Sequence, residues 1–341
     1  MLFNSIQFLL FFPLVTFLYF ILPFRYRWLL LLLASCFFYM AFIPIYILIL
    51  AITIVIDYYA GIYISQSTGK KRKFYLVISI ISTCLVLFIF KYFNFFINNF
   101  NFIGSLLGLK YPVHILHILL PIGLSFHTFQ SLSYVIEVYR GHQKPEYHFG
   151  IYSLYVMFYP QLVAGPIERP QNLLHQFHEN HSFDYSNVTN GLKRMAWGMF
   201  KKIVIADRLA LVVNFVYNDP ANQTSLSIIL ATVFFAFQIY CDFSGYSDIA
   251  IGAAQVMGYK LMNNFDRPYF SETIADFWKR WHISLSSWLR DYLFLPLAYF
   301  FSGKMKKESY LRIDSNQLIY AFATLITFTI CGLWHGAAWT F

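Results

Sequence analysis

Charged side chains are scarce in this sequence of 341 residues: Asp, Glu, Lys and Arg make up only 12%, whereas hydrophobic residues make up 58%. Soluble domains carry roughly twice that share of charge. The first 64 residues hold only three charged side chains, those of Arg25, Arg27 and Asp57. Packing in water does not explain this composition, so we predict an integral membrane protein whose partner along much of its surface is lipid.

Cysteine and nucleotide-binding motifs are also lacking. The four cysteines are isolated in apolar runs and form no C-x-x-C pair, so they predict neither a disulfide framework nor a metal site. The sequence has no G-x-x-x-x-G-K-[ST], G-x-G-x-x-G or G-x-S-x-G string. Nucleotide hydrolysis, dinucleotide redox chemistry and a serine-hydrolase elbow are therefore unsupported. The start lacks a basic n-region, and we expect a retained first helix rather than a cleaved signal.

Long hydrophobic runs fill most of the chain. A spanning helix needs about 20 mostly apolar residues, and we predict about eight to ten spans or part-spans by this measure. Runs of this length exclude a barrel, whose strands alternate every second residue, so the predicted fold is all-α. The candidate spans are residues 6–24, 28–42, 46–64, 74–96, 115–138, 151–164, 209–217, 227–256 and 318–341.

The net charge of +9 follows the positive-inside pattern. Arg25 and Arg27 follow the first apolar run, and four basic residues at 70–73 follow the third. Short basic loops of this kind face the cytoplasm, which places Met1 outside. Because the basic residues border apolar runs, we expect a membrane partner and no nucleic acid.

Residues 274–297 have a helical rhythm in which aromatic and polar positions alternate. One polar stripe at i, i+3, i+7 and i+11 consists of Lys279, His282, Ser286 and Arg290. A continuous helix with such a stripe would lie at an interface, re-enter the membrane or line a cavity. Asp242 and Asp248 likewise interrupt an apolar run, and we expect pairing with Arg267, Arg280 or Arg290 more than acid–base work.

Two histidines are the strongest candidates for chemistry. His335 lies in an apolar segment between Gly332 and Gly336, and His282 lies among tryptophans. An ionisable ring in such a segment marks a functional site by default, and a neutral imidazole can accept a proton from a hydroxyl. A structural role stays open for both: a carbonyl-bonded buried ring for His335 and a snorkelling interfacial ring for His282.

A third histidine group, His175, His178 and His181, has a spacing that could hold a metal ion. Its Gln, Glu and Asn neighbours instead indicate a solvated loop, and zinc sites on loops usually recruit further fixed ligands. We predict no metal site.

Several strings, taken as an ordered set, identify a family. They occupy residues 120–126 (LPIGLSF), 128–134 (TFQSLSY), 159–167 (YPQLVAGPI), 238–248 (QIYCDFSGYSD), 264–269 (NFDRPY), 276–292 (DFWKRWHISLSSWLRDY) and 332–341 (GLWHGAAWTF). Together they resemble the membrane-bound O-acyltransferase family, in its bacterial AlgI-like branch of alginate O-acetylation proteins.

The resemblance implies a single transmembrane domain over residues 1–341: a ring of tilted spans with re-entrant or interfacial helices around a thin centre, in the bacterial inner membrane. It implies that His335 is the catalytic histidine and His282 the second essential one. Its activity would be transfer of an acetyl group from a cytoplasmic thioester, acetyl-CoA or an acyl carrier, toward an exported polysaccharide. Periplasmic or extracellular acetyltransferase partners would take part. No cofactor is expected to stay bound.

We predict that His335 takes the proton of the acceptor hydroxyl and that His282 orients the donor or offsets developing charge. The residues that we predict to bind substrate are Lys279, Ser286, Trp334, Arg290 and Asp242.

The sequence departs from the family pattern at three places. His127 replaces a usual aromatic, residues 168–170 differ from a strict alginate member, and relatives continue with further spans beyond the position of Phe341. The chain therefore resembles a form truncated at the C-terminus. Other possibilities remain open: D-alanyl transfer to teichoic acid, a transporter without catalysis, and an inactive remnant of a longer enzyme.

Overall fold

The computed structural model describes residues 1–108, 113–116, 121, 123–163, 165–310 and 313–340. Helices form nearly all of its regular structure. Apart from them, the described residues contain one short antiparallel hairpin, in which β1 (Ser309–Tyr310) pairs with β2 (Ile313–Asp314). The predicted all-α fold is confirmed. Parts of two predicted spans (residues 117–120, 122 and 164) and the last residue, Phe341, lie outside the described residues.

The helices follow one another with short connections. The first group is α1 (Ile6–Ile21), α2 (Phe24–Met40), η1 (Pro44–Tyr46), α3 (Ile47–Gln66), α4 (Gly69–Leu87), the π-helical turn η2 (Phe88–Tyr92), α5 (Phe93–Leu106) and α6 (Leu124–Arg140). The second is α7 (Phe149–Met157), α8 (Tyr159–Leu162), α9 (Pro170–Leu173) and η3 (Leu174–His178).

The third group is α10 (Tyr185–Met199), the π-helical η4 (Phe200–Ala206), α11 (Asp207–Asn218), η5 (Pro220–Asn222) and α12 (Ser225–Val256). The last group is η6 (Pro268–Phe270), α13 (Ile274–Arg280), α14 (Ile283–Leu289), the π-helical η7 (Arg290–Phe294), α15 (Leu295–Lys304) and α16 (Ser315–His335).

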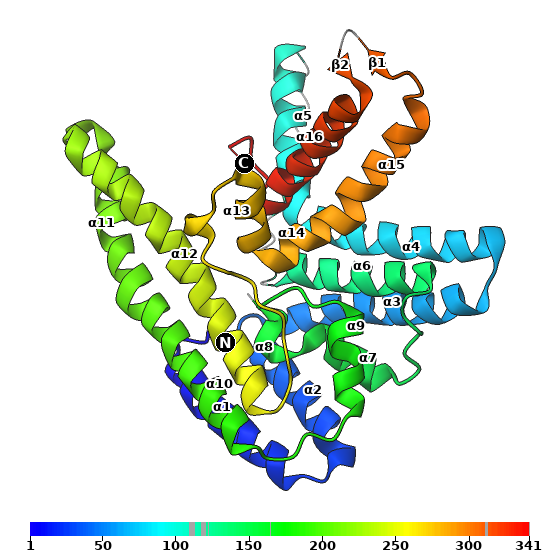
Figure 1. Ribbon diagram of the computed structural model, residues 1–341, viewed down its shortest axis with the longest axis vertical. Coiled ribbons are helices and arrows are strands. Elements are labelled where there is room, and N and C mark those ends of the chain that lie inside the picture. The colour runs from blue at the N-terminus through cyan, green and yellow to red at the C-terminus, as the bar shows by residue number, and fades with distance from the viewer. Residues whose placement is uncertain (109–112, 117–120, 122, 164, 311–312, 341) are drawn as a thin grey trace.

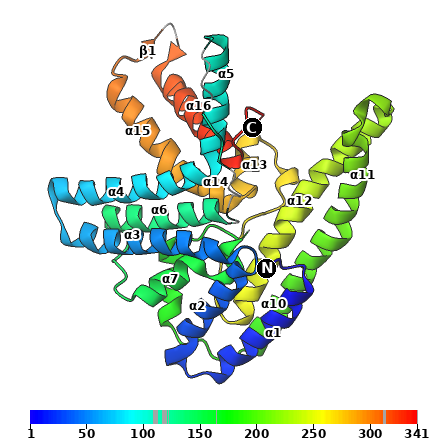
Figure 2. The same ribbon diagram turned by 180° about the vertical axis from the view of Figure 1, so that it is seen from behind.

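Three arms of helices meet near the middle of the molecule (Figure 1). One arm holds α10, α11 and α12, a second holds α3, α4 and α6, and a third holds α5, α15 and α16; the view from behind shows the same grouping (Figure 2). The helices α13 and α14 and the C-terminal end of α16 lie where the arms converge. Segments far apart in sequence therefore meet at one central place.

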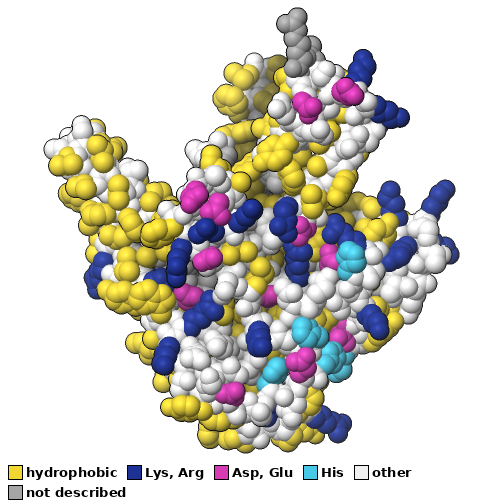
Figure 3. Space-filling view, in the orientation of Figure 1, with side chains coloured by type: hydrophobic (Ala, Val, Ile, Leu, Met, Phe, Trp, Pro, Cys, Tyr) yellow, Lys and Arg dark blue, Asp and Glu magenta, His cyan; other side chains and the backbone are white. Residues whose placement is uncertain are grey.

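Four helical segments of the described chain are long and apolar enough to cross a membrane: Pro44–Gln66, Gly69–Leu106, Ser225–Val256 and Ser315–His335, and Ile6–Ile21 is a shorter apolar helix. Large apolar side chains such as Leu211, Phe215, Leu226 and Ile229 are exposed on the α11–α12 arm. Figure 3 shows such side chains covering the outer flanks, while charged side chains gather toward the middle of this face. This distribution suits a chain surrounded by lipid at its rim.

The predicted span at residues 151–164 is wrong. The segment breaks at Phe158 into α7 and α8, and its aromatic side chains lie inside the protein: Tyr152, Tyr155, Phe158 and Tyr159 are all 0% exposed. Composition alone cannot separate these two cases, because a segment buried in protein is as apolar as one buried in lipid.

Paired glycines bring α10 and α12 into close contact. A Cβ placed on Gly198 would lie 2.6 Å from the carbonyl oxygen of Gly245, and one on Gly191 would lie 2.7 Å from that of Gly252. Small residues at a helix interface allow backbones to approach in this way. The close approach sets the polar side chains of α10 directly against those of α12.

Candidate active site

His282 lies at a break between two short helices. The predicted continuous helix over residues 274–297 is wrong, because α13 ends at Arg280 and α14 begins at Ile283. His282 itself has a left-handed backbone with φ of 43°, which is costly for a residue with a side chain. The predicted polar stripe is therefore divided, and His282 no longer shares one helix face with Lys279.

Asn264 holds His282 in this conformation. Its Oδ1 lies 3.0 Å from His282 Nδ1 and accepts from the backbone N–H and the hydroxyl of Ser284 at 3.2 and 2.9 Å. The backbone N–H of Ile283 donates to the carbonyl of Asn264 at 2.8 Å. On the other side, Asn264 Nδ2 donates to Ser247 Oγ on α12 at 3.2 Å. These contacts tie the break to α12 and offset the backbone strain.

The hydrogen bonds also assign the tautomer of His282. Because Asn264 Nδ2 is the donor to Ser247, its Oδ1 can only accept, so His282 Nδ1 carries the proton. Nε2 then has a free lone pair, and this buried atom has no hydrogen-bond partner among the described residues. Burial, followed by the nearby His335, lowers the pKa of His282 to about 3. The ring is therefore neutral and ready to accept a hydrogen bond.

Trp334 lies between the two predicted histidines. Its ring centroid is 6.5 Å from that of His282 and 4.8 Å from that of His335. Phe129 stacks on the indole at 5.2 Å, and Phe126 meets it edge-on at 5.7 Å. His282 is 3% exposed, whereas His335, the last residue of α16, is exposed. The fold thus brings His282, Trp334 and His335 together from α16 and the α13–α14 break.

The other predicted substrate-binding residues are not drawn into this group. Lys279 is exposed on α13. Ser286 Oγ donates to the carbonyl of Trp281 at 3.0 Å, which helps to close the helix break. Arg290 is exposed in η7 and pairs with Asp291 at 2.7 Å. Their positions support local structural contacts, and their role in binding substrate stays a prediction.

Asp242 and Asp248 pair with cations, but not with the arginines expected from the sequence. Lys202 Nζ lies 2.7 Å from Asp242 Oδ1, and Asp248 is held by Arg194 at 2.9 Å and by Lys201 at 2.5 Å. All three cations belong to α10 and η4, which lie along α12 because of the glycine contacts. The expected partners Arg267, Arg280 and Arg290 are replaced by this interhelical pairing.

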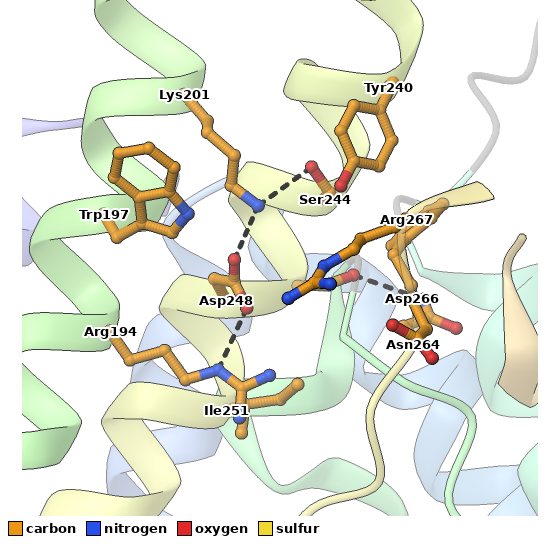
Figure 4. Close-up of a pocket in the computed structure, with 12 residues that line it drawn as sticks. Arg194, Trp197, Lys201, Tyr240, Ser244, Asp248, Ile251, Asn264, Asp266 and Arg267 are labelled. Atoms are coloured by element: carbon orange, nitrogen blue, oxygen red, sulfur yellow. Dashed lines mark hydrogen bonds and ion pairs between the residues drawn. The ribbon is translucent and has the colours of Figure 1, made fainter. Parts of the chain in front are cut away.

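A polar cavity of about 200 Å³ adjoins Asn264 (Figure 4). Arg267, which also has a left-handed backbone at φ 45°, extends its guanidinium into this space. Lys201 is 6% exposed and donates to Ser244 Oγ at 2.9 Å. The lining residues are Arg194, Trp197, Lys201, Tyr240, Ser244, Ser247, Asp248, Ile251, Asn264, Phe265, Asp266 and Arg267. Its wall therefore presents three cations and two carboxylates to a ligand.

Asn264 connects this cavity, here called the α10–α12 pocket, to His282. The same amide lines the pocket and fixes the imidazole. Sequence analysis did not identify Asn264, Lys201 or Arg267 as site residues. Only the string at residues 264–269 signalled that this loop has a role, because the contacts themselves join residues far apart in the chain.

The histidines at 175, 178 and 181 do not converge. His178 Nε2 lies 2.7 Å from Glu146 Oε2, and His181 Nε2 lies 2.9 Å from the carbonyl of Gln176, while His175 lies 3.9 Å from Glu179. Across the part of the chain that the structure describes, no three His, Cys, Asp or Glu side chains are placed to hold a metal ion.

Comparison with known proteins places this geometry among relatives. The description "MBOAT, membrane-bound O-acyltransferase family" matches residues 16–341. "Probable alginate O-acetylase AlgI" of Azotobacter vinelandii is 38% identical over 100% of this chain and 66% of its own length, and the protein of that name from Pseudomonas aeruginosa is 38% identical over 100% and 63%. "Peptidoglycan O-acetyltransferase" of Helicobacter pylori is 35% identical over 91% of this chain and 61% of its own length. The chain spans about two thirds of the length of the relatives that it matches.

Proposed function

Because this chain belongs to the membrane-bound O-acyltransferase family, we propose that it transfers an acetyl group from a thioester donor toward a hydroxyl of an exported polysaccharide. It is a multi-pass membrane protein, and the place that we propose for it is the bacterial inner membrane. The relatives named for alginate and for peptidoglycan both carry acetyl groups to glycans by their names. An alginate-type polysaccharide is the acceptor that we propose.

The meeting of two histidines on either side of one indole is the observation that supports this proposal most. In the proposed reaction His335 accepts the proton of the acceptor hydroxyl as its oxygen attacks the thioester carbonyl carbon. The carbon–sulfur bond then breaks, and the leaving sulfur takes the proton from His335, so that the products are an ester and a thiol. The apolar rings of Phe126, Phe129 and Trp334 keep water from competing with the acceptor.

His282 has a different part in this proposal. With Nδ1–H bonded to Asn264, its Nε2 accepts a hydrogen bond from an N–H or O–H group of a substrate. Because Asn264 also lines the α10–α12 pocket, we assign to His282 the positioning of the donor rather than a second proton transfer.

The α10–α12 pocket suits a donor with phosphate groups, and we propose acetyl-CoA. Arg194, Lys201 and Arg267 face this cavity, and arginine forks match phosphate oxygens in geometry and charge. Arg194 and Lys201 are engaged with Asp248, whereas Arg267 is exposed and extends into the cavity. We expect Arg267→Ala to raise KM for acetyl-CoA about tenfold with little change in kcat, the result of losing binding that ground and transition states share. An unchanged KM would exclude the pocket as the donor site.

The test of the function uses variants of the chromosomal gene. We expect His335→Ala to abolish O-acetyl groups on the surface polysaccharide and His282→Ala to lower them about 100-fold, within the range for a lost catalytic group. His175→Ala, an exposed histidine of the η3 loop, is the matched control. Membrane vesicles supplied with radiolabelled acetyl-CoA would show label in the polysaccharide only with both site histidines present.

Each alternative function gives a different result in these experiments. Normal O-acetyl content in His335→Ala would overturn the proposed role of this ring. Label that crosses the membrane without entering an ester would indicate a transporter. Label that enters teichoic acid only from a D-alanyl carrier protein would indicate D-alanyl transfer, and an unchanged glycan after gene deletion would indicate an inactive protein.

A further inference from the structure

Side chains from η2 and α5 hold the end of α16 on both sides of His335. Lys91 Nζ donates to the carbonyl oxygen of Trp334, and Tyr92 OH donates to that of Leu333 at 2.9 Å. Beyond the histidine, Trp339 Nε1 donates to Asn99 Oδ1 at 2.9 Å. The backbone that carries the imidazole is therefore fixed before and after it by one neighbouring helical segment.

These contacts satisfy groups that the helix itself leaves unpaired. The last four carbonyls of an α-helix have no intrahelical N–H partner. After His335 the chain leaves the helix, since Gly336 is extended with φ of −160°. Cations and other donors near a helix C-terminus stabilise such carbonyls and the negative end of the helix dipole. Lys91 and Tyr92 provide this cap from a different part of the chain.

The location of Lys91 is unusual for a lysine. It lies in a π-helical turn, η2, where α4 gives way to α5 and the chain turns from one arm of helices into another (Figures 1 and 2). Its neighbours at residues 88–92 (FIFKY) are otherwise aromatic or apolar. The ammonium also lies 5.5 Å from the Trp334 ring centroid and 3.3 Å from Ser125 Oγ. π-turns and charges within apolar segments are both associated with functional sites.

We propose that Lys91 and Tyr92 are positioning residues for the acyl transfer, which set the imidazole of His335 against the acceptor hydroxyl by holding the carbonyls of Trp334 and Leu333. This inference rests on the proposed function, and it adds residues that neither the sequence strings nor the family relationship assign. A displacement of about 1 Å at a reacting group can cost about 100-fold in rate. The clamp acts on the two peptide groups that precede the imidazole, where small shifts reach the ring directly.

The experiment compares three variants in membrane vesicles with radiolabelled acetyl-CoA. We expect Lys91→Met to lower kcat about 100-fold and Tyr92→Phe about tenfold, while KM for acetyl-CoA stays within about twofold, because a misplaced base affects the chemical step and not donor binding. Lys91→Arg restores a donor cation and should recover at least about a tenth of wild-type kcat. Lys70→Met, at the exposed start of α4, is the matched control and should match wild type.

A second measurement does not depend on turnover. Diethylpyrocarbonate modifies accessible imidazoles, and mass spectrometry gives the rate at His335 relative to that at His175. We expect Lys91→Met to change the His335 rate at least about threefold and Lys70→Met to leave it unchanged, since only the first releases the helix end. Wild-type vesicles without transfer activity, combined with this change of rate, would overturn the proposed function while supporting the clamp.

Three results would overturn the positioning role. One is a kcat of Lys91→Met within about twofold of wild type, since a misplaced base should cost far more. The second is equal loss in Lys91→Arg and Lys91→Met. The third is an unchanged modification rate at His335 in Lys91→Met, which shows that the helix end is held without the ammonium.

Discussion

The two histidines of the site have opposite surroundings. His282 is buried, and an amide from a distant loop fixes its tautomer and its strained backbone. His335 is exposed at the end of a helix, and the contacts around it fix the backbone rather than the ring. A ring held by side-chain hydrogen bonds keeps one protonation state, whereas a ring held through its backbone can gain and lose a proton. The division suits one histidine that positions and one that transfers.

The largest effect is expected when the His282 network is cut at its centre. Asn264→Ala would leave His282 Nδ1–H and the Ser284 donors buried without an acceptor, each at a cost of about 1–3 kcal/mol. We expect a loss of about 3 kcal/mol in unfolding free energy and no measurable transfer activity. Thermal unfolding in detergent and O-acetyl content measure the two. Asn190→Ala, an exposed residue on α10, is the control, and equal stability of both variants would contradict the network.

Glu168 should make the His282 half of the site sensitive to pH. This buried carboxyl accepts from the backbone N–H of Met262, two residues before Asn264, and burial raises its pKa to about 7 from 4.5. The folded state then binds more protons, so stability falls as pH rises from about 4.5 to about 7, by about 3 kcal/mol in total. Glu168→Gln keeps the acceptor and should remove this fall. Parallel stability curves for wild type and variant over this pH range would show that Glu168 is not responsible.

The glycine contacts offer a way to disturb the His282 half alone. Gly198→Val would place its Cβ 2.6 Å from the Gly245 carbonyl oxygen, and this backbone atom cannot turn aside as a side chain can. We expect about 2 kcal/mol of destabilisation and loss of the α10–α12 pocket, with an unchanged diethylpyrocarbonate rate at His335. The control is Gly303→Ala, where a Cβ would meet nothing within 4 Å. A stable variant with normal donor KM would contradict the close packing.

The smallest effect is expected at Lys279. The helix break places this exposed side chain on α13 rather than on one stripe with His282, so Lys279→Ala should lower kcat/KM less than about threefold, the effect of a surface charge on encounter. Vesicle assays at two acetyl-CoA concentrations measure it. A loss above about 30-fold would restore the single polar stripe that the sequence predicts.

Apolar run length was sufficient to predict the fold class, and the ordered strings were sufficient to select His282 and His335. Periodicity failed at residues 274–297, because the left-handed turn at His282 depends on hydrogen bonds to Asn264, which no local pattern contains. It failed again at residues 151–164, where the apolar side chains meet protein instead of lipid. Asn264 and Lys91 could not be chosen from the sequence, since each acquires its role from a contact with a distant segment.

A single indole connects the two halves of the site. Because Trp334 borders both imidazoles and its buried Nε1 has no hydrogen-bond partner among the described residues, a substrate that supplied an acceptor to this nitrogen would turn the ring. Such a turn would be felt by both histidines at once. Arrival of the first substrate could in this way prepare the place of the second, and the order of addition would be written in the orientation of one tryptophan.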